Sequence, residues 1–106
     1  MRFHVDIIPD FPHDWSPEKL TDMLAQETEA AVNLMARGIL LRIDRVVGRG
    51  GNVSLWETES LEQLDEVIKA LPMAPFIKVS VTPLTKHRVQ IAYEESLRGG
   101  AAASRQ

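Results

Sequence analysis

The chain has 106 residues, of which 44% are hydrophobic and 25% charged, a composition typical of one globular domain. Twelve Lys and Arg residues against fifteen Asp and Glu residues give a net charge of −3, which argues against a basic nucleic-acid groove or a polybasic membrane patch. The absence of cysteine excludes a disulfide framework, a thiolate nucleophile and a Cys-ligated metal site. No apolar run reaches the roughly 20 residues of a membrane span, and Asp6 and Pro9 interrupt the region where a signal peptide would be apolar. We therefore expect a small, soluble, cytoplasmic protein.

The first half of the chain predicts a strand, a long helix and a β-hairpin. These elements are expected at residues 3–8, 17–37, 39–47 and 52–58. Residues 3–8 alternate apolar and polar side chains with the period of a half-buried strand. Ser16 and Pro17 form a helix start, and Gly38 supplies the C-terminal stop. The glycine-rich residues 48–51 have the turn chemistry that joins two strands into a hairpin.

The second half predicts one more helix and one more strand. Ser60 and Gln63 have the spacing of a capping box. Apolar residues then recur at helical spacing as far as Leu71, and Pro72 closes the helix. Residues 76–84 alternate apolar and polar side chains, which predicts a fourth strand.

The resulting element order, βαββαβ, defines the fold class. It is the order of the α+β ferredoxin-like fold, a four-stranded antiparallel sheet with two helices on one face. We expect residues 1–94 to form this single domain and residues 95–106 to form a flexible C-terminal tail. The other sheet face either stays open to water or is covered by a second copy, which would make a dimeric α+β barrel. The apolar character of residues 39–47 favours the covered arrangement.

Glu27 is the residue that does not fit its surroundings. On a helical wheel it lies within the apolar sector of the first helix. That sector includes Leu20, Leu24, Ala31 and Leu34. A carboxylate in this position must be hydrogen-bonded, paired or kept neutral. Pairing with Arg45 or Arg42 would make a structural ion pair, whereas a place at the edge of a cavity would make Glu27 a proton-transfer catalyst.

The third predicted strand carries a polar face. Val53 and Leu55 are the apolar pair, so we expect them to face the helices. The opposite face then presents Asn52, Ser54 and Trp56. By the same alternation His4 points toward this face, and the hairpin brings Arg45 close to Ser54. None of the three histidines has the spacing of a metal ligand, so no metal site is expected.

Over about residues 1–88 the sequence resembles the muconolactone Δ-isomerase family of small, cofactor-free enzymes. The matching features, taken together in register, are Phe3-His4-Val5, Pro12, Pro17-x-Lys19-x-Thr21, Glu27 with Glu29, Arg45-x-x-Gly48, Asn52-x-Ser54, Leu71-Pro72-x-x-Pro75 and His87. The resemblance implies a ferredoxin-like barrel assembled into a homo-oligomer, with a dimer as the minimum unit and a decamer as the larger assembly. It also implies that no cofactor is needed.

The activity implied by the resemblance is a shift of the double bond of an unsaturated lactone in aromatic-compound catabolism, within the β-ketoadipate pathway. Glu27 would act as both base and acid. Asn52 and Ser54 would donate hydrogen bonds to the lactone oxygen as negative charge develops on it, and Arg45 would bind the carboxylate of the substrate's acetate arm. The other candidate substrate-binding residues are His4, Trp56 and His87.

The chain departs from the family pattern at Leu40, Asp44 and Gly50, where family members carry aromatic residues. These replacements are expected to enlarge or reshape the pocket, so the substrate can differ from muconolactone. A lactone dehalogenase, or another cofactor-free proton-transfer enzyme, is the alternative within enzymes. A non-catalytic barrel that binds a small acid or serves assembly is the alternative outside them, because fold does not fix function.

Overall fold

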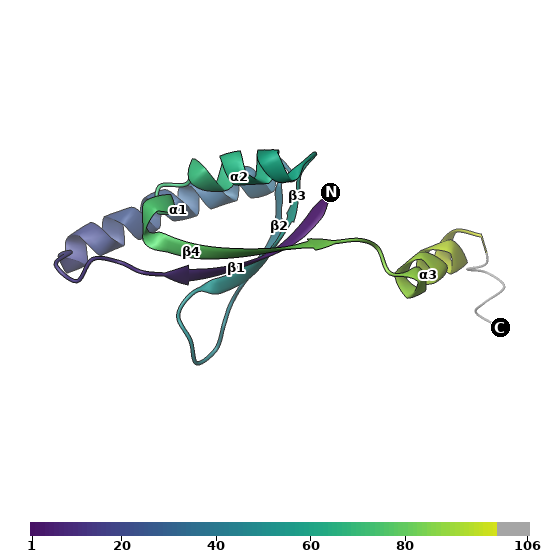
Figure 1. The fold of residues 1–106 in the computed structure, drawn as a ribbon, viewed down its shortest axis with the longest axis horizontal. Helices are drawn as coiled ribbons and strands as arrows, with labels where there is room; N and C mark the ends of the chain where they lie inside the picture. The colour runs from purple at the N-terminus through teal and green to yellow at the C-terminus, as the bar shows by residue number, and fades with distance from the viewer. Residues whose placement is uncertain (100–106) are drawn as a thin grey trace.

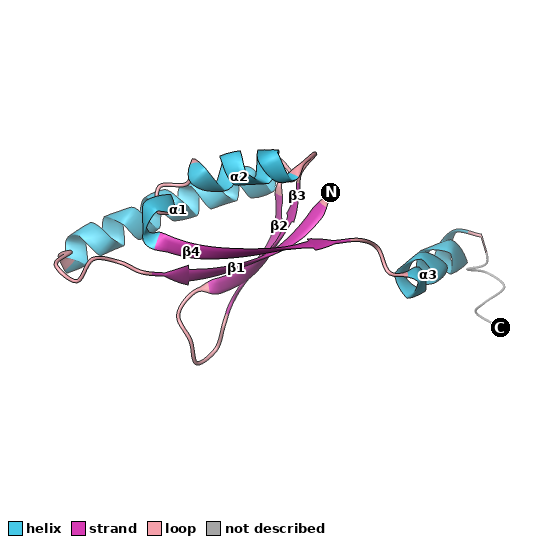
Figure 2. Ribbon diagram, in the orientation of Figure 1, coloured by secondary structure: helices cyan, strands magenta, loops and turns pink. Residues whose placement is uncertain are grey.

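The structure, a computed structural model, describes residues 1–99. Its elements are β1 (Arg2–Pro9), α1 (Pro17–Ala36), β2 (Leu40–Arg45), β3 (Asn52–Glu57), α2 (Leu61–Lys69), the 3₁₀ helix η1 (Ala74–Phe76), β4 (Ile77–Leu84) and α3 (Arg88–Arg98). The strands form one antiparallel sheet in the order β2-β3-β1-β4, and α1 and α2 lie on one side of it (Figures 1 and 2). The ferredoxin-like prediction is confirmed. None of these helices is both long enough and apolar enough to cross a membrane.

Side-chain caps begin both sheet-packed helices, as the sequence predicts. At α1 the Ser16 hydroxyl accepts a hydrogen bond of 3.1 Å from the Lys19 N–H. At α2 the Ser60 hydroxyl accepts from the Gln63 N–H at 3.0 Å. The Gln63 amide oxygen in turn accepts from the Glu59 N–H at 2.6 Å, so two otherwise unpaired donors are satisfied.

Gly51 fixes how closely the β2–β3 hairpin approaches β1. Its φ of +91° lies in the region that L-residues rarely adopt. A Cβ placed at this position would also overlap the carbonyl oxygen of Ile7 on β1. Glycine is therefore required here for two independent reasons, one conformational and one steric.

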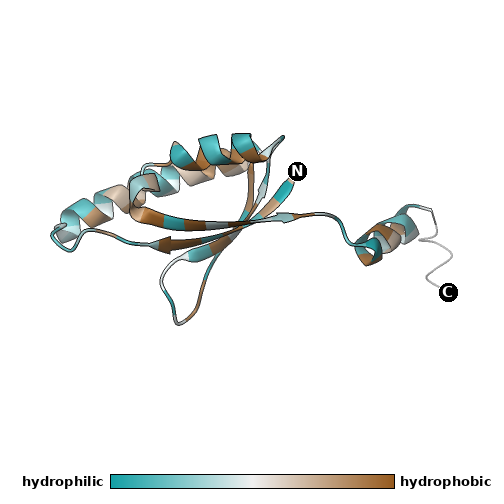
Figure 3. Cartoon of the chain, viewed as in Figure 1, coloured by the Kyte–Doolittle hydropathy of each residue, from teal (hydrophilic) through white to brown (hydrophobic). Residues whose placement is uncertain are grey.

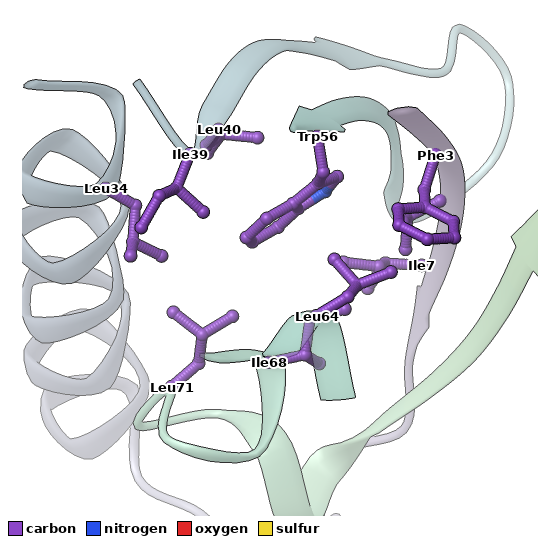
Figure 4. Packing of buried hydrophobic residues seen from close by; sticks show 10 residues of the cluster. Phe3, Ile7, Leu34, Ile39, Leu40, Trp56, Leu64, Ile68 and Leu71 are labelled. Carbon is purple, nitrogen blue, oxygen red and sulfur yellow. The ribbon is translucent and has the colours of Figure 1, made fainter. Parts of the chain in front are cut away.

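The hydrophobic core lies between the sheet and the helices. Phe3 and Val5 from β1 and Leu64 from α2 are almost completely buried. Figure 4 shows the indole of Trp56 in the middle of this cluster. Phe3 and Ile7 of β1 lie on one side of it, and Leu34, Ile39 and Leu40 lie on the other, with Leu64 and Ile68 of α2 below. The hydrophobic colouring of Figure 3 follows the strands and the sheet-facing sides of the two helices.

The prediction that Val53 and Leu55 face the helices is wrong. Trp56 pairs with Phe3, and Ser54 pairs with Val5, so Trp56 and Ser54 share the buried face of β1. Both are buried, at 2% and 4% exposure. The large indole removes more apolar surface from water than Leu55 would, and hydrogen bonds satisfy the Ser54 hydroxyl.

His4 lies on the open face of the sheet and not beside Asn52. It pairs with Leu55 on β3 and with Thr82 on β4, and all three belong to the face away from the helices. This face also carries two ion pairs. They are Arg42–Asp44 at 2.8 Å and Arg49–Asp6 at 3.1 Å.

A third helix, α3, was not predicted. It lies beyond the end of β4, away from the sheet and the other two helices (Figure 1), and none of its residues is buried. Residues 95–98, which fall within the predicted tail, form the last turn of this helix. Residues 100–106, the rest of the predicted flexible tail, lie outside the described residues.

Candidate functional site

A cavity of about 430 Å³ lies between α1, the sheet and the segment that follows α2. Its walls are mostly apolar and include Phe11, Leu40 and Trp56. Three polar side chains line it: Glu27 from α1, Arg45 from β2 and Asn52 from β3. A mostly apolar pocket with a few polar groups is the usual form of a small-molecule site.

Glu27 is half-buried, and one of its carboxylate oxygens is fixed. Its Oε1 accepts a hydrogen bond of 3.0 Å from the backbone N–H of Met73. Burial raises the pKa of the Glu27 carboxyl above its ordinary value, because the charged form is desolvated, and the Met73 bond partly opposes this rise. Within residues 1–99 no Lys or Arg forms a salt bridge with Glu27, and Arg42 pairs with Asp44 instead. The ion-pair alternative for Glu27 is therefore not supported.

Arg45 and Asn52 are direct neighbours across the β2–β3 ladder, at the rim of the pocket. Ser54 pairs with Ile43, so Arg45 is a diagonal neighbour of Ser54, two residues away from its direct partner on β2. Arg45 is exposed and takes part in no salt bridge within the described chain. The amide oxygen of Asn52 is buried without a hydrogen-bond partner among residues 1–99. Both side chains thus retain unused capacity to bind a ligand.

Ser54 does not line the pocket. Its hydroxyl accepts a hydrogen bond of 2.8 Å from Trp56 Nε1 and donates one of 3.3 Å to the carbonyl oxygen of Val5. These bonds use the hydroxyl within the core. Trp56 does line the pocket, so Ser54 reaches the site only by orienting the indole.

The two candidate histidines also lie away from the pocket in this chain. His4 is on the opposite face of the sheet. His87 precedes α3, where its Nδ1 accepts a hydrogen bond of 3.0 Å from the Val89 N–H. Of the predicted polar set, the structure brings together Glu27, Arg45 and Asn52. In residues 1–99 no group of three or more His, Asp or Glu side chains is placed to hold a metal ion.

The group that sequence reasoning missed is the backbone N–H of Met73. A backbone donor has no sequence signature of its own, and a side-chain inventory cannot find it. The available signal was Pro72 together with Pro75, which indicates a rigid turn after α2. The spacing of the two prolines does not predict which side chain forms a hydrogen bond with the backbone of this turn.

The fold and the pocket together define a two-layer α+β protein with a carboxyl group in a mostly apolar site between sheet and helix. The family model described as muconolactone delta-isomerase matches residues 1–90. The chain belongs to this family. The muconolactone Δ-isomerase of Rhodococcus opacus is 33% identical over 85 residues, which cover 80% of this chain and 91% of that protein.

Solved structures agree with this assignment. A crystal structure of muconolactone isomerase superimposes with a TM-score of 0.76 at 32% identity, covering 82% of this chain and 91% of that one. A 5-chloro-2-hydroxyhydroquinone dehydrochlorinase from Burkholderia phenoliruptrix has a TM-score of 0.63 at 18% identity, with 84% of this chain and 98% of that one covered. At that identity the second likeness shows the fold alone.

Proposed function

We propose that the protein is an isomerase that moves the C=C bond of an unsaturated lactone, muconolactone or a close relative. The observation that carries the proposal is Glu27, a carboxyl group with a raised pKa in a mostly apolar pocket of the size of a small ligand. Raising the pKa makes the carboxylate a stronger base than an ordinary Glu, and the same group can return the proton that it has taken. The family and its relatives support the same reaction class.

The proposed reaction is a proton transfer in two steps. The Glu27 carboxylate removes the acidic ring hydrogen as a proton. The electrons of the broken C–H bond move through the conjugated system to the carbonyl oxygen of the lactone, giving a dienolate. The protonated Glu27 then returns a proton to the carbon next to the carbonyl. The double bond has moved, the carboxylate is regenerated and no other reactant is consumed.

Three other side chains of the pocket assist the proposed reaction. Asn52 lines the pocket, and the NH2 group of its side-chain amide is the donor that would hydrogen-bond the dienolate oxygen as charge develops on it. Arg45 at the rim is available to bind the substrate's carboxylate with its planar, two-pronged guanidinium. Trp56 forms an apolar wall against which the ring packs.

The test is proton NMR of muconolactone with the purified protein in deuterated buffer, with the Glu27→Gln variant measured in parallel. We expect double-bond migration with deuterium uptake in the wild type and a loss of at least about a thousandfold in the variant, because Gln cannot act as a base. Glu29→Gln, an exposed carboxyl two residues away that does not line this pocket, is the matched control and keeps the wild-type rate.

Other outcomes separate the alternatives. A Glu27→Gln variant with near-wild-type turnover would show that another group is the base. Binding of muconolactone by the wild type without turnover or deuterium exchange would support a small-acid-binding protein instead. Release of halide from a halogenated lactone, without isomerisation, would support the dehalogenase alternative.

We also propose that the functional form is a homo-oligomer with a dimer as its minimum unit. The support is α3, whose Val89, Tyr93 and Leu97 recur at helical spacing and are 60%, 57% and 42% exposed. An isolated helix of 11 residues is marginal in water, and none of the residues of α3 is buried within the described part of the chain, so a partner surface for its apolar side would stabilise it. Light scattering after size exclusion is expected to give a molar mass that is a multiple of the 11.9 kDa of one chain. The double variant Tyr93→Glu, Leu97→Glu is expected to have a lower molar mass, because the new charges disrupt the apolar side of α3. A wild-type protein that elutes as a monomer would contradict this proposal.

A further inference from the structure

We infer that the backbone N–H of Met73 is the positioning group of the Glu27 carboxylate: it holds Oε1 and leaves Oε2 to move the proton. This inference rests on the proposed function, because it assigns a role to the same carboxyl. The contact that carries it is the 3.0 Å hydrogen bond between Met73 N and Glu27 Oε1. Oε2 has no hydrogen-bond partner within the described chain.

The donor is available because of the type of turn in which it lies. The Ala74 N–H donates to the Leu71 carbonyl oxygen at 3.0 Å, which closes a β-turn over residues 71–74. Met73, the third residue, has φ −90° and ψ 3°, the values of a type I turn. Pro72 is the second residue, where its ring fixes the φ that this turn needs. A type I turn uses the N–H of its fourth residue, so that of Met73 remains free to bind Glu27.

The turn is also held firmly in place. Leu71 and Met73 are both buried, at 7% and 4% exposure. The Phe76 N–H donates to the Met73 carbonyl oxygen at 2.8 Å, and the Asp10 N–H donates to the Phe76 carbonyl oxygen at 2.7 Å. The turn is thereby tied to the residue that follows β1. The N–H that contacts Glu27 is part of the rigid scaffold, which is the condition for orienting a catalytic group.

The bond has a consequence for the ionisation of Glu27. It stabilises the charged carboxylate against burial, which favours the neutral acid. Within residues 1–99 Arg45 on β2 is the only other charged side chain that lines the pocket; β1, β3, the residues after α2 and the 10–16 loop contribute none. Loss of the Met73 N–H is therefore expected to raise the pKa of Glu27 further, and to free the carboxylate to rotate.

The sharpest experiment replaces the amide at residue 73 by an ester, using the α-hydroxy acid analogue of methionine. This substitution removes the N–H and keeps the side chain. Met73→Leu is the matched control, because it changes the side chain at nearly constant volume and keeps the N–H. The readouts are the ¹³C NMR titration of the Glu27 carboxyl, assigned by its absence in Glu27→Gln, and the pH dependence of kcat for the lactone.

We expect the ester to raise the Glu27 titration midpoint by about one pH unit and to lower kcat about tenfold, since hydrogen bonds to charged groups are the stronger ones. KM is expected to be little changed. Met73→Leu keeps the N–H, so the Glu27 titration midpoint is expected to stay at the wild-type value. Because the Met73 side chain lines the pocket, the kcat of Met73→Leu is the reference against which the kcat of the ester is compared. Pro72→Ala, which relaxes the turn without removing the N–H, is expected to act in the same direction as the ester with a smaller effect.

The outcomes distinguish this inference from the proposed function. An ester protein with an unchanged midpoint and unchanged kcat would overturn the inference and leave the isomerase proposal standing. A raised midpoint in a protein that never isomerises the lactone would support the positioning role while the proposed function fails. An equal fall in kcat for the ester and for Met73→Leu, with no change in midpoint, would mean that residue 73 acts by packing alone.

Discussion

Two positions on the same strand, separated by a single residue, show how the helix-covered face of the sheet is divided. At one end of this face Ser54 is buried, and its hydroxyl is satisfied within the core by hydrogen bonds with the Val5 carbonyl and the Trp56 indole. At the other end Asn52 and Arg45 face the pocket with unused hydrogen-bonding capacity. We call these the closed end and the pocket end. The difference predicts that substitutions at the closed end mainly change stability, whereas substitutions at the pocket end mainly change the proposed activity.

The largest effect is expected at the closed end. Phe3→Ala removes an almost completely buried ring and leaves a cavity beside Trp56, which is expected to lower the free energy of unfolding by about 3–5 kcal/mol. Urea denaturation measures this loss. Activity per folded molecule is expected to stay near the wild-type value, since Phe3 does not line the pocket. A large fall in the activity of the fully folded variant would mean that the two ends are not separate.

At the pocket end the pattern is reversed. Asn52→Ala is expected to lower kcat about a hundredfold, the effect of removing one donor to a developing oxyanion. Its free energy of unfolding is expected to change by less than about 0.5 kcal/mol, because no hydrogen bond of the Asn52 amide oxygen is lost. Parallel kinetics and denaturation give both numbers. A destabilised variant with normal kcat would assign Asn52 to the closed end.

A smaller effect is expected for the cation at the rim. In the proposed reaction Arg45 would bind the substrate's carboxylate equally in the ground and transition states. Arg45→Gln removes this charge, so KM is expected to rise about tenfold with kcat little changed. Arg42→Gln is the matched control, since Arg42 pairs with Asp44 on the other face of the sheet. If both variants raised KM equally, the effect would come from net charge and not from the rim.

The smallest effect concerns stability and pH. Burial raises the pKa of Glu27 in the folded state above its unfolded value, so the folded state binds this proton more tightly. The stability of the wild type is therefore expected to fall as the pH rises from the unfolded pKa through the folded pKa. The Glu27→Gln variant has no proton to bind at this position, so its stability lacks this pH dependence. The amide oxygen of the glutamine can still accept a hydrogen bond from the Met73 N–H. We expect the Tm of the wild type relative to the variant to fall from pH 4 to pH 8. The opposite slope would mean that the carboxylate is stabilised in the fold.

The fold could be predicted because its signals are local. Ser16, Gly38 and Ser60 mark helix ends through their own caps and dihedral preferences, and these positions are confirmed. The faces of β3 could not be predicted in this way. Alternation separates Asn52, Ser54 and Trp56 from Val53 and Leu55, but it does not say which set is buried. That choice depends on a hydrogen bond between Trp56 and Ser54 that only the folded strand makes.

The same distinction between local signals and features that depend on the folded sheet applies to the candidate site. Glu27 stands out on a helical wheel because a carboxyl in an apolar sector is unusual, and the structure places it in the pocket. The pairing of Arg45 with Asn52 depends on the hairpin register, which is set by the turn between these two residues. The bulge between Leu40 and Arg42 lies farther along the ladder and changes only the pairing of Leu40. No single-residue pattern gives that register. α3 escaped prediction because the Gly- and Ala-rich residues that follow it suggested that the chain had already lost its structure.

Gly51 sets a limit on how this pocket can be redesigned. Because any side chain there would collide with the backbone of β1, a mutational library should leave this position constant. Gly50 differs, since a Cβ at that position would meet only the ring of Pro9, at 3.7 Å, and Pro9 itself lines the pocket. Substitutions at Gly50 can therefore be used to vary the substrate range, while Gly51 is kept as glycine.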